Sequence, residues 1–261
     1  MRIPVVGQSR IAVVRHDTRR RRARRRRVVW AGGELLVTVG VVLLLLVVHQ
    51  LWWTNREARR GAERKVEALE REWGTGGPAD APGAVPESAS SHAPEAPAAR
   101  RQPITRPARP SWSQAYAILT IPRLHLRVPV AEGVGKQAVL DKGYVGHYPG
   151  TQQPGQAGNF ALAGHRNTHG EPFRHLNRLA AQDTVQVETR TAVYTYAVDQ
   201  TLDRTSARDS GVLNRVPRST VRTAYGYSEP GYYLTLTTCT PEYTSRYRLV
   251  VWAKLTSVRP R

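Results

Sequence analysis

The chain has 261 residues and an unusual charge balance for a globular protein. Its 39 Lys and Arg against 20 Asp and Glu give a formal net charge of +19, and only two Phe are available for packing. The single cysteine, Cys239, excludes an intramolecular disulfide framework and any zinc or iron–sulfur site built from several cysteines. This composition argues against a small soluble cytosolic domain.

An apolar run near the N-terminus predicts a membrane span. Leu35–Trp53 contains no Asp, Glu, Lys or Arg. A helix rising about 1.5 Å per residue needs roughly 20 such residues to cross a hydrocarbon core of about 30 Å. No small-residue cleavage site follows the run, so we expect an uncleaved signal-anchor helix over 28–54 rather than a signal peptide.

The charges that flank this run predict its orientation. Residues 19–27 read RRRRARRRR, whereas the segment that follows the run is nearly neutral. Positive flanks stay inside, so we expect a single-pass protein of the cell membrane with a cytoplasmic N-terminus and everything after residue 54 outside. An Arg block beside a span is typical of a topology anchor that contacts anionic lipid, and no nucleic-acid partner is expected.

Composition divides the rest of the chain. A segment rich in Arg, Glu and Ala predicts a short juxtamembrane helix, and the following stretch, with eight Pro and nine Ala in 74–110, predicts a disordered spacer that holds a folded domain away from the bilayer. The expected parts are a basic tail, the span, the charged helix, the linker and one folded domain: 1–27, 28–54, 55–73, 74–112 and 113–261.

The periodicity of the folded domain is mainly that of strands. One stretch after Pro172 has helical spacing, with Phe173, Leu176 and Leu179 as its apolar positions. Many strands with one helix predict a closed or nearly closed β-barrel. We expect Ser113–Arg261 to fold alone as a soluble monomer without metal or disulfide. The short β-branched or aromatic runs that predict strands are 117–121, 126–130, 159–163, 184–189, 192–198, 232–237 and 248–255.

Three residues in this domain suggest nucleophilic chemistry. Cys239 ends one predicted strand and Arg248 begins the next, so a thiol and a guanidinium would meet at one end of the barrel. A thiolate can attack a carbonyl while a fixed cation stabilises the oxyanion. His165, in a Gly-flanked turn after a predicted strand, is the candidate proton carrier, and no carboxylate follows it closely enough to be nominated as its orienting partner.

The remaining histidines carry weaker signals. His165 and His169 are four residues apart, which resembles a zinc motif, but a metalloprotease helix has Glu directly after the first His and here Arg166 stands there. No metal site is therefore predicted. The other histidines of the domain are expected to be exposed or structurally hydrogen-bonded: His125, His147 and His175.

Three segments of the domain together resemble the sortase family. They are ILTIPRLHLRVPVAEGV (118–134), GHYPGTQQPGQAGNFALAGHR (146–166) and TLTTCTPEYTSRYRLVVWAKL (235–255). The resemblance implies an eight-stranded β-barrel with one or more short helices, preceded here by one transmembrane helix and the Pro/Ala-rich linker. The TLTTC form and the long N-terminal extension are most similar to class E sortases of high-GC actinobacteria.

The resemblance also implies an activity and a site. Sortases are cysteine transpeptidases of Gram-positive bacteria, and the catalytic positions fall on Cys239, His165 and Arg248, with Thr237 and Thr238 expected to contact substrate. The implied reaction cleaves an LAXTG- or LPXTG-type sorting signal between Thr and Gly and joins the secreted protein to a peptidoglycan amine. No cofactor is implied. Arg246 is set aside because Arg248 is the residue that begins the apolar strand.

Two alternatives remain open from the residues alone. Another cysteine-type wall enzyme is disfavoured, because papain-like enzymes place Cys before His, and the Ser-His-Gly-Cys motif of L,D-transpeptidases is absent at Thr168–Glu171. A non-catalytic, membrane-tethered wall-binding module with an inert Cys239 is the second alternative. Thiol reactivity in the native protein distinguishes it from an enzyme.

Overall fold

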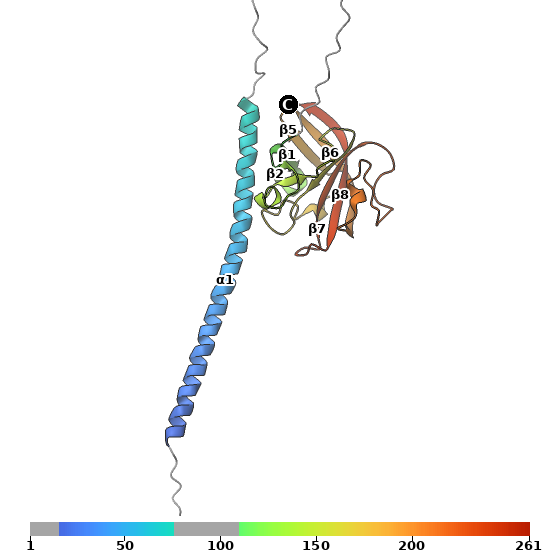
Figure 1. Cartoon of the computed structure of the whole chain (residues 1–261). Coiled ribbons are helices and arrows are strands. Elements are labelled where there is room, and N and C mark those ends of the chain that lie inside the picture. Colours follow the sequence, from blue (N-terminus) through green and yellow to red (C-terminus); the bar gives the residue numbers. More distant parts are fainter. Residues whose placement is uncertain (1–15, 76–109) are drawn as a thin grey trace, which may run out of the picture. The chain divides into compact units, whose positions relative to one another are not determined.

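The computed structural model describes residues 16–75 and 110–261 (Figure 1). The first fifteen residues of the predicted basic tail and residues 76–109 of the predicted linker lie outside the described residues. The chain divides between Trp52 and Trp53 into two units, each of which is described by itself.

Helix α1 (His16–Thr75) contains both the predicted span and the predicted charged helix. No proline interrupts these 60 residues, so nothing in the sequence ends the helix at the boundary expected between residues 54 and 55. Its apolar segment has a mean hydropathy of 2.5, and none of that segment is buried. By length and composition, α1 can cross a membrane.

The last third of α1 belongs to the same unit as the barrel and packs against it. Its buried positions recur every three or four residues, which is the stripe of one helix face: Ala58, Ala62, Val66, Leu69 and Trp73. Val66, Leu69 and Trp73 form an apolar cluster with barrel residues that include Ile118 and Val139. Beside the cluster, Glu70 accepts a hydrogen bond from Arg127 at 2.6 Å.

This packing bears on the predicted domain boundaries. The helix residues that precede the linker already contact the barrel. The core of the domain is also not confined to residues 113–261, because Ile118 is fully buried in the cluster that α1 completes.

We therefore expect the fragment 113–261 to be less stable than the chain that keeps α1. Within the full chain, Leu69→Ala should lower the free energy of unfolding by about 2–3 kcal/mol, as for other large-to-small changes at buried positions. Glu67→Ala, at an exposed position of the same helix, is the matched control and should change it by less than about 0.5 kcal/mol. Thermal unfolding in detergent measures both. Equal stability of the full chain, the Leu69→Ala variant and the fragment 113–261 would show that the helix does not contribute to the fold.

Eight strands close into one barrel, as the sequence predicted. The barrel is closed in the order β1-β2-β3-β4-β7-β8-β6-β5, so every strand edge is paired. The strands are β1 (Ala115–Ile121), β2 (Leu126–Glu132), β3 (Val145–His147), β4 (Gly158–Ala163), β5 (Thr184–Thr189), β6 (Ala192–Ser206), β7 (Tyr232–Thr240) and β8 (Tyr247–Pro260).

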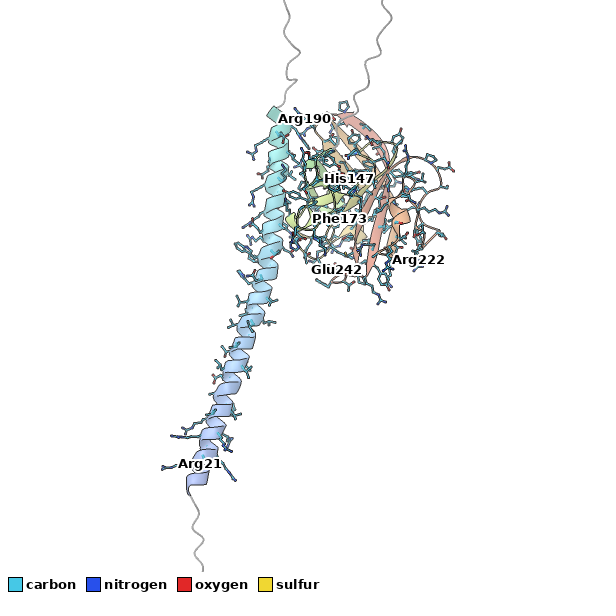
Figure 2. All side chains as sticks on the ribbon, in the orientation of Figure 1. Arg21, His147, Phe173, Arg190, Arg222 and Glu242 are labelled. Atoms are coloured by element: carbon cyan, nitrogen blue, oxygen red, sulfur yellow. The ribbon has the colours of Figure 1, made fainter. Side chains whose placement is uncertain are left out.

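The core lies inside this closed barrel. Alternate residues of each strand point inward, and the residues that fill it include Phe160, Leu234 and Val251, all nearly or fully buried. Phe173, labelled in Figure 2, is fully buried in the same cluster although it lies in a loop. The loop after β4 is therefore fastened to the core by an aromatic anchor.

Two elements differ from the sequence prediction. Strand β3 was not predicted, because three residues are too short for periodicity to register. The helix expected after Pro172 is only the 3-10 turn Leu176–Arg178. Its apolar residues recur at a spacing of three, which matches the three residues per turn of a 3-10 helix, and both Leu176 and Leu179 are buried.

Candidate active site

The ends of three neighbouring strands bring the candidate residues together. β4 and β7 are parallel neighbours, and Ala163 pairs with Thr237, so the segments that carry His165 and Cys239 leave the sheet at the same level. β8 runs antiparallel to β7, and its register sets Arg248 directly opposite Cys239. Residues paired in this way project to the same face with Cβ atoms about 4.5–5.5 Å apart.

Cys239 is half-buried and free on β7. Because side chains alternate along a strand, Thr237 shares its face and Thr238 points to the other. Thr238 is buried, and its hydroxyl donates to the carbonyl oxygen of Gly164 at 2.8 Å, which fastens β7 to the residue before His165. This contact is structural, and substrate binding by Thr238 stays a prediction.

Arg166 is a site residue that sequence reasoning considered only as a mismatch to a zinc motif. Its side chain is buried, and Nη1 donates to the carbonyl oxygen of Cys239 at 3.1 Å and to Oγ1 of Thr240 at 2.9 Å. Nη2 donates to Asn177 at 3.4 Å. The Arg166 side chain thus links the backbone at Cys239 to the turn that carries His165.

His165 lies in the turn after β4 and has a carboxylate partner. Its Nε2 lies 2.8 Å from Oδ1 of Asp141, and both side chains are partly exposed. Asp141 belongs to the 3-10 turn Leu140–Lys142, 24 residues before His165. The sequence does not indicate this partner, because Asp141 precedes His165 and the fold, not the local sequence, brings the two turns together.

Gly164 explains how this turn fits the core. A Cβ atom at Gly164 would lie 2.7 Å from the ring of Phe173, which is buried and cannot move aside cheaply. The backbone NH of Phe173 in turn donates to the carbonyl oxygen of His165 at 3.0 Å. The packing of Gly164 on the Phe173 ring and the hydrogen bond from the Phe173 backbone to His165 therefore fix the backbone of the turn that carries the imidazole.

The structure separates the two candidate arginines. Arg248 lies within β8, and its Nη1 donates to the carbonyl oxygens of Ser245 at 2.8 Å and Tyr247 at 2.9 Å, which orients the guanidinium. Arg246 is exposed in the loop before β8, where its guanidinium lies 5.2 Å from the ring centroid of Tyr247. Only Arg248 is held opposite the thiol by the register of the sheet.

A cavity of about 170 Å³ opens beside this rim. Thr237 and Arg248 line it together with Tyr148, whose hydroxyl lies 3.1 Å from the hydroxyl of Thr237. Further lining residues come from 205–213, which covers the end of β6 and the segment after it. Substrate binding by Thr237 stays a prediction, and the cavity adds Tyr148, which the sequence did not indicate.

The carboxylate of Asp209 stabilises the segment 205–213 that lines this cavity. Asp209 is buried and accepts hydrogen bonds from the hydroxyls of Thr205, Ser219 and Thr220 and from the backbone NH of Thr220. Burial alone would raise the pKa of Asp209, but the hydrogen bonds from Ser219, Thr205 and Thr220 outweigh it and lower that pKa. Asp209 therefore stays ionised and fixes this segment.

Two further histidines differ in their position relative to the site. His147 is buried, with Nδ1 2.7 Å from Glu132 and Nε2 2.9 Å from Thr151, which is the structural role expected of it. His169 was not expected at the site, yet its ring centroid lies 5.4 Å from that of His165. Asp141, His165 and His169 could together supply three ligand atoms to a metal ion.

A closed barrel that presents a thiol, an imidazole and a guanidinium at one rim is the architecture of a cysteine transpeptidase. Residues 119–256 match the Sortase domain family, and the chain belongs to the sortase family. The family predicted from the three motifs is thereby confirmed.

The relatives also support the predicted subclass. The chain is 40% identical to Sortase SrtE1 of Streptomyces coelicolor over 216 residues, which are 81% of this chain and 52% of the relative. It is 33% identical to Sortase SrtE2 of the same organism, over 78% of this chain and 73% of the relative. The chain therefore spans about half the length of SrtE1.

Solved structures agree on the fold. The crystal structure of sortase E1 from Streptomyces coelicolor, with a tripeptide in its active site, matches 59% of this chain and 94% of its own chain at 47% identity and a TM-score of 0.54. Sortase E from Streptomyces avermitilis matches 57% and 93% at 40% identity and a TM-score of 0.51. The matches confirm the predicted sortase barrel and the likeness to class E sortases.

Proposed function

We propose that this protein is a membrane-anchored transpeptidase that cleaves an LAXTG- or LPXTG-type sorting signal between Thr and Gly and attaches the protein to a peptidoglycan amine. The observation that carries the proposal is the pairing of Cys239 with Arg248 on adjacent strands, beside the turn that holds His165. Family membership supports the reaction class. The sorting motif and the acceptor rest on the resemblance.

In the first step, the thiol proton of Cys239 passes to His165, and the Sγ thiolate attacks the carbonyl carbon of the Thr residue. A carbon–sulfur bond forms, the carbonyl oxygen gains negative charge, and Arg248 stabilises that charge from across the sheet. The carbon–nitrogen bond to Gly then breaks. His165 gives a proton to the leaving amine, so that a thioester remains on the enzyme and the C-terminal fragment leaves.

In the second step, an amine of a peptidoglycan precursor attacks the thioester. His165 takes the proton of that amine, the carbon–sulfur bond breaks as the new amide forms, and His165 returns the proton to sulfur to restore the thiol. Asp141 holds Nε2 of His165. In this proposal Nδ1 carries the transferred proton, and Asp141 is a positioning residue.

The cavity beside the rim supplies a place for the sorting signal. It is lined by Tyr148, Thr237 and Arg248, and its size suits a short extended peptide segment rather than a folded domain. The tripeptide bound in the active site of sortase E1 from Streptomyces coelicolor supports a peptide ligand here. Arg248 lines both the cavity and the rim, so it can contact the peptide backbone next to the bond that breaks.

The N-terminal helix fits this role. Its apolar segment would anchor the chain in the cell membrane, and the Arg-rich flank before that segment would keep the N-terminus in the cytoplasm. The barrel would then act outside the cell as a monomer on secreted proteins. External protease should remove a C-terminal tag from intact cells and spare a tag placed before Arg19.

Incubation of the full chain with LAXTG and LPXTG peptides tests the function. We expect a mass increase on the Cys239 peptide that equals the acyl fragment, and release of the Gly-containing fragment. Prior alkylation of the only thiol in the chain is the control and should remove both signals. A native thiol that resists alkylation, with no acyl adduct from either peptide, would indicate a non-catalytic module instead.

Asp141→Asn should lower kcat for peptide cleavage roughly 10- to 100-fold, as loss of a partner that orients a reactive imidazole commonly does. KM and the midpoint of thermal unfolding should change little, because Asp141 is partly exposed and would not touch the peptide. Steady-state kinetics and thermal unfolding measure the three quantities. An equal fall in kcat and in stability would instead mean that Asp141 only supports the fold.

A further inference from the structure

The turn after β4 and the 3-10 turn Leu140–Lys142 together form a cluster of three side chains, of which the proposed proton transfers use only two. Asp141, His165 and His169 each offer one ligand atom, and these atoms all lie within 4.8 Å of one another. Asp141 and His165 have roles in the proposed reaction. His169 has no role in the proposed reaction, although it lies beside His165.

The spacing of these atoms is that of a metal site. Oδ1 of Asp141 lies 2.8 Å from Nε2 of His165 and 3.7 Å from Nδ1 of His169. Zinc binds imidazole nitrogen and carboxylate oxygen at about 2.0–2.2 Å, so two ligand atoms of a tetrahedral site are about 3.3–3.5 Å apart. The two observed separations bracket that value, and the ligand atoms of His165 and His169 lie within 4.8 Å of each other, so side-chain shifts would bring the three atoms to three corners of the tetrahedron.

His169 supplies a second, independent observation. Its Nδ1 is buried and makes no hydrogen bond within the described part of the chain. A buried polar atom without a partner costs about 1–3 kcal/mol, so such atoms are rare. The backbone of His169 also has φ +52°, which is uncommon for a residue other than glycine. The fold thus holds an imidazole nitrogen that has no hydrogen bond and lies 3.7 Å from a carboxylate oxygen, beside a second imidazole.

The neighbouring residues keep this turn in place. Asn55 and Arg59 of α1 bind the two residues after His169: the Asn55 amide donates to Glu171 at 2.9 Å, and Arg59 donates to the carbonyl oxygen of Gly170 at 3.0 Å. Glu171 is buried and also accepts a hydrogen bond from Arg174 at 2.7 Å. The turn that carries His165 and His169 is therefore held by hydrogen bonds from α1 to Gly170 and Glu171.

We propose that Asp141, His165 and His169 form a binding site for a zinc-like divalent transition metal ion, and that the bound ion switches the enzyme off reversibly. Two imidazoles and one carboxylate suit such an ion and leave one position open to water. The metal would occupy Nε2 of His165 and displace Asp141 from its orienting contact. An imidazole held by a metal keeps one fixed orientation and resists protonation, so it cannot exchange a proton with the substrate amine.

Metal binding is tested without any reliance on catalysis. The full chain with the Cys239→Ala substitution, in detergent, is titrated with zinc chloride in a calorimeter. The substitution ensures that the thiol cannot contribute to binding. We expect about one ion per chain, and His169→Asn on this background should weaken binding by at least tenfold, since loss of even an outer-shell partner costs roughly 10- to 100-fold. Asn tolerates positive φ, so the turn is preserved.

His125→Asn is the matched control. His125 also has a positive φ, of +48°, but lies outside the cluster. It should bind zinc as the parent does. Absence of zinc binding in the parent, or equal loss in both Asn variants, would overturn the proposed site.

The inhibition arm rests on the proposed function. In the chain with Cys239 intact, zinc should stop peptide cleavage and a chelator should restore it. His169→Asn should cleave at the parent's rate without zinc and should need at least about tenfold more zinc for inhibition. Equal inhibition of parent and variant would overturn the switch and place the ion on the thiol. Failure to cleave any peptide would sink the proposed function, while the calorimetry would still decide the site.

Discussion

Cys239→Ala is expected to abolish acylation completely. The chain contains no other thiol, so no residue can replace the nucleophile. The thiol lies on a strand whose backbone is held by the buried Arg166 at the carbonyl of Cys239 itself, so the loss of one sulfur atom should leave the rim intact. Mass spectrometry after incubation with sorting-signal peptide measures the adduct, and thermal unfolding reports the fold.

His165→Ala is the companion variant and tests the proton carrier. All proton transfers of the proposed reaction run through one imidazole, so we expect a loss of at least about 100-fold in turnover. The thiol is still present in this variant and should still react with an alkylating reagent. A variant that turns over at near the parent's rate would show that another group carries the proton.

The fold was largely predictable because its pattern is local. Seven of the eight strands follow from alternating β-branched and aromatic residues, and only β3, with three residues, escaped. The ends of β6 and β8 run beyond the predicted limits because they pair with each other over a long register, from Ala192 with Pro260 to Ser206 with Tyr247. Such pairing is a property of the closed sheet and not of either segment alone.

The catalytic candidates were predictable for the same reason, and their partners were not. Cys239 and Arg248 flank one loop, so their meeting follows from two adjacent strands. Asp141 reaches His165 from a 3-10 turn 24 residues earlier in the chain, and its own segment has no feature that points to the imidazole. The contact of α1 with the barrel was also missed, although its stripe of Ala, Val, Leu and Trp was legible in the sequence.

The packing of α1 on the barrel and the geometry of the site are connected. Gly143 ends the 3-10 turn that carries Asp141, and a Cβ atom there would lie 2.8 Å from the backbone oxygen of Ala58 in α1. Gly143 also has φ +79°, which favours glycine. The same helix binds the turn after His169 through Asn55 and Arg59. The segment after the predicted span therefore supports both turns that orient the imidazole.

Arg248→Ala should lower acylation roughly 100- to 1000-fold, which corresponds to about 3–4 kcal/mol of transition-state stabilisation. The reason is geometric, since the register of β7 and β8 sets this guanidinium opposite the thiol, and hydrogen bonds to the carbonyls of Ser245 and Tyr247 orient it. Arg248→Lys should recover only part of the loss, because an ammonium group lacks the planar fork that binds two acceptors. Single-turnover acylation of Cys239 measures both variants.

Arg246→Ala is the matched control for Arg248→Ala. Arg246 lies two residues before Arg248, in the loop before β8, carries the same charge and is exposed, with its guanidinium 5.2 Å from the ring centroid of Tyr247. Its loss should change acylation by less than about threefold, since exposed surface substitutions usually shift a free energy by no more than about 0.5 kcal/mol. Equal losses in the two variants would mean that net charge near the rim, and not the register of β8, stabilises the oxyanion. Near-normal acylation by the Arg248→Ala chain would remove the guanidinium from the site altogether.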